Sequence, residues 1–102
     1  LLRSAVESAE KLGVEYKVGN IVSSDAFYHA DAECNNKWKD MGVLAVEMEA
    51  AGLYCNAAKL HKKALCIATI SDHIYKGTAS TSEEREKTFT DMMKIALDVA
   101  TK

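Results

Sequence analysis

Two short apolar runs constrain the fold of this 102-residue chain more than any other feature. Residues 43–46 read VLAV and residues 64–70 read ALCIATI, a continuous pattern typical of strands buried on both faces of a sheet. The segment between them, residues 47–63, has helical character. Two such strands joined by a helix make a right-handed crossover in a mainly parallel sheet. The sequence therefore predicts an α/β fold.

The segments before and after this core continue the alternation of helix and strand. Apolar residues at helical spacing predict helices over residues 1–12 and 31–41, each followed by a glycine. Between them, the β-branched and aromatic residues of 14–22 predict a strand that leads into a polar loop. Residues 74–80 are expected to form a loop.

The last helix is the most clearly patterned element. Its apolar residues recur at i, i+3, i+4, i+7 from Phe89 onward, which gives one apolar face. Ser80 followed by Glu83 predicts a capping box at its start. The chain has no proline, repeat or low-complexity tract, so we interpret residues 1–102 as part of a single domain.

Charge and cysteine content exclude several classes of protein. The 13 basic and 15 acidic residues give a net charge of −2, which argues against binding to nucleic acid or anionic lipid. No apolar stretch approaches the roughly 20 residues needed to span a bilayer, so no membrane association is expected. Three cysteines without CxxC spacing favour reduced thiols in the cytoplasm, and no histidine lies at metal-ligand spacing, so no metal site is predicted.

Polar clusters follow three of the predicted strands, at positions where ligands collect in α/β sheets. They are Ser23 to Tyr28, Glu47 to Glu49, and Ser71 to His73. In the second cluster, Glu47 and Glu49 would repel each other without a partner. Their carboxylates could accept hydrogen bonds from a vicinal diol such as that of ribose. Alternatively, one or both are acids at a helix start, favoured by the helix dipole.

In the third cluster, Asp72 directly follows an apolar strand, where a carboxyl group in a partly apolar environment can act as an acid. Alternatively, Asp72 accepts hydrogen bonds from loop backbone as an Asx-turn. Arg85 comes 13 residues later in the first turns of the last helix and could reach Asp72, or it could simply be a solvated helix residue. In the first cluster, Phe27 and Tyr28 could stack on a heterocyclic base or pack into the core.

Four segments, taken together, closely resemble the bacterial hexameric purine nucleoside phosphorylases of the nucleoside phosphorylase family. They are GNIVSSDAFYHAD (19–31), GVLAVEMEAAGLY (42–54), ATISDHI (68–74) and SEEREKTFTDMMKIAL (82–97). The EMEA motif alone would also admit uridine phosphorylases, whereas SDH with an arginine 13 residues later favours the purine enzymes. The resemblance implies a three-layer α/β/α fold with a mainly parallel mixed sheet, of which residues 1–102 are the C-terminal part.

The same resemblance implies an activity: reversible phosphorolysis of purine ribo- and deoxyribonucleosides to free base and pentose 1-phosphate. It implies no metal or organic cofactor, phosphate as co-substrate, a homohexamer, and a cytoplasmic role in purine salvage. Carried onto this sequence, Asp72 would protonate N7 of the leaving base with help from Arg85. The implied substrate-binding residues are Phe27, Val46, Glu47, Met48, Glu49 and Ser71.

Two alternatives remain open at this stage. The glycine-rich and arginine-containing phosphate-binding segments of the family do not occur in this sequence, so the chain could be a non-catalytic nucleoside-binding or assembly fragment. The other alternative keeps the enzyme and changes the base, as in uridine phosphorylase.

Overall fold

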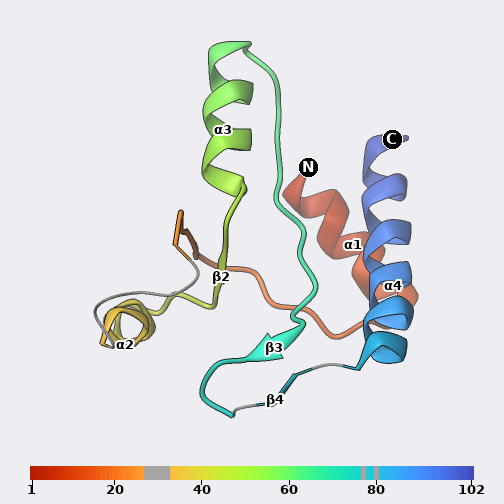
Figure 1. The fold of residues 1–102 in the computed structure, drawn as a ribbon. Coiled ribbons are helices and arrows are strands. Elements are labelled where there is room, and N and C mark those ends of the chain that lie inside the picture. Colours follow the sequence, from red (N-terminus) through yellow and green to blue (C-terminus); the bar gives the residue numbers. More distant parts are fainter. Residues whose placement is uncertain (27–32, 77, 80) are drawn as a thin grey trace. The chain divides into compact units, whose positions relative to one another are not determined.

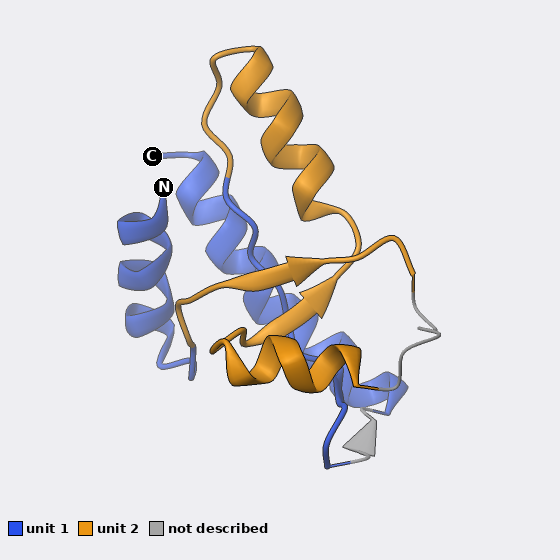
Figure 2. Cartoon of the chain, turned by 90° about the vertical axis from the view of Figure 1, so that its left-hand side faces the viewer, with its two compact units in different colours: residues 1–16, 65–102 blue, residues 17–64 orange. Residues whose placement is uncertain are grey.

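A computed structural model describes residues 1–26, 33–76, 78–79 and 81–102 (Figure 1). The chain divides into two compact units, residues 1–16 with 65–102 and residues 17–64, which Figure 2 colours separately. The first contains α1 (Leu2–Leu12), β3 (Asp72–His73), β4 (Thr78–Ala79) and α4 (Ser82–Ala100). The second contains β1 (Ile21–Ser23), α2 (Cys34–Asp40), β2 (Ala45–Glu47) and α3 (Ala50–Lys59). Helices combined with a small parallel sheet agree with the predicted α/β class.

The first unit is built on the packing of α1 against α4. Ala5 and Ala9 of α1 and Ile95 of α4 are buried together, and partly buried Leu65, Ile67 and Val99 pack against them. Small residues on α1 let the two helices approach closely. Ala5 and Ala9 lie on the face of α1 that was predicted from spacing. On α4 the prediction is wrong in part, because the core uses Ile95 and Val99, whereas Met93 and Leu97 of the predicted apolar face are 56% and 65% exposed.

One polar contact accompanies this apolar packing. Ser8 of α1 is buried, and its hydroxyl group hydrogen-bonds the carboxylate of Asp98 on α4. This bond and the nearby charge of Lys102 lower the pKa of Asp98, against an opposing effect of desolvation. Asp98 therefore stays ionised where α4 meets α1.

The helix ends follow local rules, with one shift from prediction. Gly13 takes a left-handed conformation with φ 67°, and the N–H of Val14 donates to the Ala9 carbonyl, as in a Schellman motif. At the start of α4 the cap is Thr81, whose hydroxyl accepts from the N–H of Glu84 at 3.1 Å. The predicted cap, Ser80, lies outside the described residues. Thr81 with Glu84 has the same spacing as the predicted pair, one residue later.

The second unit is organised by a two-stranded parallel sheet. Strand β1 pairs with β2 in the register Ile21↔Ala45, Val22↔Val46 and Ser23↔Glu47. The N–H of Leu44 donates to the Asn20 carbonyl just before the paired residues, and the N–H of Ser24 donates to the Glu47 carbonyl just after them. The pairing thus brings Ser23, at the end of β1, beside the start of the connection from β2 to α3.

The predicted strands are only partly correct. Residues 64–70 form no strand in the described chain, because no neighbouring strand pairs with their backbone there. Two apolar residues of this run, Leu65 and Ile67, nevertheless pack against the core of the first unit. The predicted strand over 14–22 is likewise reduced to β1, which begins only at Ile21. The parallel partner of β2 is therefore β1 and not the predicted strand at 64–70.

A short antiparallel pair occupies part of the predicted loop over 74–80. Strand β3 pairs with β4 in the register Asp72↔Ala79 and His73↔Thr78. Two-residue strands are too short to produce a periodic pattern, so the sequence gives no signal for them. The pairing places Asp72 on a short strand, directly after the apolar run that it was predicted to follow.

Candidate active site

The connection from β2 to α3 brings the predicted acidic cluster onto a tight corner, residues 47–51, which we call the Glu47 corner. Oε2 of Glu47 accepts hydrogen bonds from the N–H groups of Glu49 and Ala50, both at 2.6 Å. These N–H groups lie at the start of α3, where helical amides lack partners within the helix. Glu47 thus satisfies amides at the start of α3 from outside the helix, two residues before the N-cap Glu49, and does not lie in the first helical turn.

The ionisation of Glu47 follows from these contacts. Desolvation raises its pKa, but hydrogen bonds from the N–H groups of Glu49 and Ala50 and from the Ser23 hydroxyl outweigh it, so the net pKa is lowered. Its other oxygen, Oε1, is buried and has no hydrogen-bond partner among the residues that the structure describes. Glu47 is therefore held as a carboxylate with one oxygen fully engaged.

Ser23 closes the same corner from the neighbouring strand. Its Oγ accepts from the N–H of Ala51 at 3.1 Å, and its hydroxyl group helps to lower the pKa of the Glu47 carboxyl. The next amide of α3 is thereby satisfied by a residue 28 positions earlier in the chain. Sequence analysis placed Ser23 in a polar cluster but assigned it no role, and its position directly after an apolar strand was the only signal.

Met48 and Glu49 follow Glu47 in the corner. The N–H of Met48 donates to Oε2 of Glu49 at 3.2 Å, so the amide and the carboxylate lie side by side on the outside of the corner. Both residues are exposed, as is Val46 on β2. An amide donor next to a carboxylate acceptor is suited to a hydroxyl group, which can accept from one and donate to the other.

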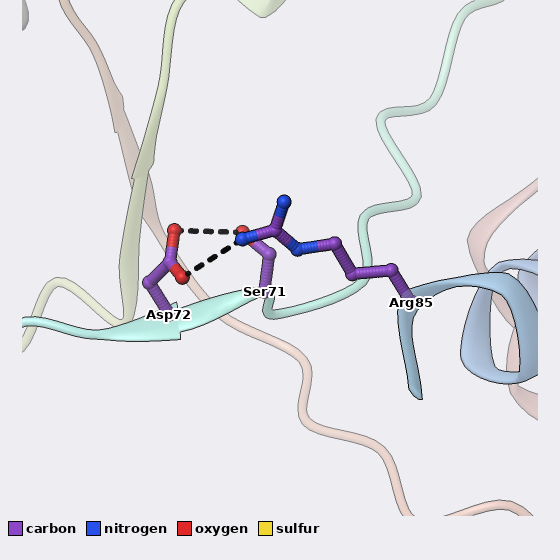
Figure 3. Close-up of polar contacts among 3 residues, drawn as sticks. All are labelled: Ser71, Asp72 and Arg85. Atoms are coloured by element: carbon purple, nitrogen blue, oxygen red, sulfur yellow. Dashed lines mark hydrogen bonds and ion pairs between the residues drawn. The ribbon is translucent and has the colours of Figure 1, made fainter. Parts of the chain in front are cut away.

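The first unit holds the second predicted group (Figure 3). Asp72 on β3 accepts from Ser71 Oγ at 3.2 Å through one carboxylate oxygen and pairs with Nη2 of Arg85 at 3.5 Å through the other. Arg85 lies in the first turns of α4, where its N–H bonds the carbonyl of the Thr81 cap. The contact between Arg85 and Asp72 suggested by their spacing is present.

This pair is open to solvent. The side chains of Arg85 and Asp72 are 42% and 51% exposed, and their contact is long for a charge-assisted hydrogen bond. Exposed ion pairs of this kind contribute about 0.2–1 kcal/mol. The carboxylate is therefore only weakly held and is accessible to an incoming group.

The predicted site residues are thus distributed between the two units. The second unit carries Val46, Glu47, Met48 and Glu49, and the first brings Ser71, Asp72 and Arg85 together. Phe27, predicted to stack on a base, lies outside the described residues. Among the residues that are described, no three His, Cys, Asp or Glu side chains cluster as a metal site would require. The helices described are too short or too polar to cross a bilayer.

Comparison with known proteins places these residues in a family. The family model described as the phosphorylase superfamily matches residues 1–102. Relatives named purine nucleoside phosphorylase DeoD-type occur in Caldanaerobacter subterraneus subsp. tengcongensis, 54% identical over 98% of this chain, and in Exiguobacterium sp., 53% identical over 98%. One from Aliivibrio salmonicida is 50% identical over the whole chain. The chain spans 42–43% of the length of these relatives.

Proposed function

The chain belongs to the phosphorylase superfamily, and on that premise we propose that it acts in a purine nucleoside phosphorylase. The observation that carries the proposal is the identity of 50–54%, over 98–100% of the chain, to proteins of that name. The same names favour a purine over the uridine alternative. The reaction proposed is the reversible phosphorolysis of purine ribo- and deoxyribonucleosides.

In this reaction a phosphate oxygen forms a bond to the anomeric carbon while the bond from that carbon to the base nitrogen breaks. The electron pair of the broken bond moves onto the purine, where a proton at N7 neutralises it. We assign Asp72 as the donor of that proton, since general acids act at such positions. Arg85 and Ser71, both in contact with Asp72, would orient its carboxyl group.

The Glu47 corner supplies the proposed ribose contacts. A ribose hydroxyl that replaces the internal contact between Met48 N–H and Glu49 Oε2 can accept from the amide and donate to the carboxylate. Neither group is then left without a partner, so little is lost on desolvation. This supports Glu49 as the ligand of the ribose hydroxyls. The resemblance to the family adds Met48, Val46 and Glu47 beside the nucleoside and Phe27 stacked on the base.

The wider assignments belong to the same proposal. Phosphate is the co-substrate, no metal or organic cofactor takes part, and the active form is a homohexamer in the cytoplasm that serves purine salvage. The near-neutral charge balance supports small-molecule substrates over nucleic acid or membrane partners.

The test is turnover by the complete protein on inosine and on uridine, each with and without phosphate. We expect phosphate-dependent release of hypoxanthine from inosine and little release of uracil from uridine. Preferred release of uracil would identify a uridine phosphorylase instead. Nucleoside binding without turnover in the presence of phosphate would support the non-catalytic alternative and overturn the proposal.

A further inference from the structure

We propose that Ser23 is a positioning residue for the nucleoside site, acting through Glu47 and the first turn of α3 and making no contact with the substrate. The inference rests on the proposed function, because it concerns how the ribose-binding residues of that site are held. We call the bond that its Oγ accepts from the Ala51 N–H, together with the pairing of Ser23 with Glu47 across the two strands, the Ser23 clamp.

The clamp fixes the Glu47 corner from both sides. From within the corner, the Glu47 carboxylate accepts hydrogen bonds from the N–H groups of Glu49 and Ala50. From the neighbouring strand, Ser23 Oγ accepts a hydrogen bond from the N–H of Ala51. The strand pairing Ser23↔Glu47 and the bond from Ser24 N–H to the Glu47 carbonyl fix the backbone of both residues. The backbone that carries Glu49 therefore has few remaining ways to move.

A hydroxyl group is required at position 23, because its oxygen accepts the hydrogen bond from the Ala51 N–H and it can also donate toward the Glu47 carboxylate. Alanine would leave the Ala51 N–H without this acceptor, and the corner would then be held by the bonds from the Glu49 and Ala50 N–H groups to Glu47 alone. Glu49 would then lose its fixed position relative to the Met48 N–H. Misplacement of a binding group by about 1 Å can cost up to about 100-fold in rate.

The experiment measures kcat/KM of the complete protein for inosine and for 2′,3′-dideoxyinosine, which lacks both ribose hydroxyls. We expect Ser23→Ala to lose about 10- to 100-fold on inosine and about threefold or less on the dideoxy substrate, because only inosine uses Glu49. Ser23→Thr keeps the hydroxyl group and should remain close to wild type on both. Ser23→Cys, a weak donor and acceptor of similar size, replaces Ser23→Ala if that variant does not fold.

A matched control and a double mutant complete the design. Ser24→Ala removes the neighbouring hydroxyl, whose bonds are local contacts with Ala26, and should leave both substrates unaffected. In a Glu49→Gln background, Ser23→Ala should add little further loss on inosine, because residues acting as one unit are not additive.

Equal losses on the two substrates, or full additivity with Glu49→Gln, would show a general structural effect and overturn the inference. Failure of the proposed function gives a different result, since the wild-type protein would then release no hypoxanthine from inosine and phosphate.

Discussion

The Glu47 corner and the Asp72–Arg85 pair differ in how firmly they are formed without substrate. In the corner, hydrogen bonds of 2.6 Å link the half-buried Glu47 carboxylate to the amides of Glu49 and Ala50, and a bond of 3.1 Å links the amide of Ala51 to Ser23 on the paired strand. The pair consists of two half-exposed side chains at 3.5 Å. The backbone that carries the proposed ribose ligand Glu49 is thus fixed in advance, whereas the side chain proposed to move a proton is only loosely held.

This difference fits the two tasks. A binding site gains affinity when its groups are ordered before the ligand arrives, because the ordering cost is not paid on binding. An acid must change its protonation state during each turnover, and catalytic hydrogen bonds are often long until substrate is bound. Substitutions in the two regions should therefore affect different kinetic parameters.

The largest effect is expected at Asp72, whose replacement removes the proton donor. Asp72→Asn should lower kcat for inosine by about 10²–10⁴-fold, the usual contribution of general acid catalysis. A 7-alkylated purine nucleoside already carries positive charge on the base and should be largely spared. The measurement is the ratio of the loss in kcat for inosine to the loss in kcat for the 7-alkylated nucleoside. Equal damage to both substrates would mean that Asp72 positions the base or holds β3 and does not act as the acid.

The next largest effect is expected at Glu49, in the Glu47 corner. Glu49→Gln should weaken use of ribonucleosides by about 1.5–3 kcal/mol, the range for a hydrogen bond to a charged group, or about 10- to 150-fold in kcat/KM. The dideoxy substrate serves as the control, because it has no hydroxyl for Glu49 to bind. Unchanged efficiency with inosine would contradict the diol-binding role and leave Glu49 as a helix-start acid.

A smaller loss is expected at Arg85. Arg85→Ala should reduce kcat for inosine by about fivefold or less if the pair contributes as an exposed ion pair does, about 0.2–1 kcal/mol. Arg85→Lys, which keeps the charge and loses the planar fork, is the matched control. A loss as large as that of Asp72→Asn would remove the contrast between the regions, because the pair would then act as one tightly coupled unit.

The smallest effect is a pH dependence of stability in the corner. Because folding lowers the pKa of Glu47 below its usual value near 4.5, its contribution is complete above that pH and is lost as pH falls through the lowered pKa. Wild type should thus unfold at a higher temperature than Glu47→Gln near pH 7, and the two should converge in acid. Melting curves across this range provide the measurement. If the difference in melting temperature between wild type and Glu47→Gln grew in acid, the prediction that folding lowers the pKa of Glu47 would be contradicted.

The elements that could be predicted from sequence are those whose pattern is long. Helices α1 and α4 have apolar spacing over several turns, and each ends or begins with a recognisable capping residue. The run at 64–70 was predicted as a strand because apolar residues alone cannot reveal whether a neighbouring strand is present to pair with it.

The candidate site shows the same limit. Asp72 and Arg85 could be linked because they lie 13 residues apart across one strand and one helix start. Residue type and position suggested an acid at Asp72 and a diol ligand at Glu47 and Glu49, each beside an alternative, and the resemblance to a known family favoured these roles. The bonds of Ser23 could not be predicted, because its partners lie in another element and are reached only through the register of β1 on β2.

The bond between Ser23 and Ala51 also has a consequence for the order of folding. With 10 residues, α3 is shorter than the roughly 12–15 that an isolated helix needs to be marginally stable in water. Part of its N-terminal cap comes from β1, so this stabilisation appears only after the chain has closed the intervening loop and paired β1 with β2. We therefore expect α3 to form late, with Ser23→Ala accelerating unfolding and leaving the refolding rate almost unchanged.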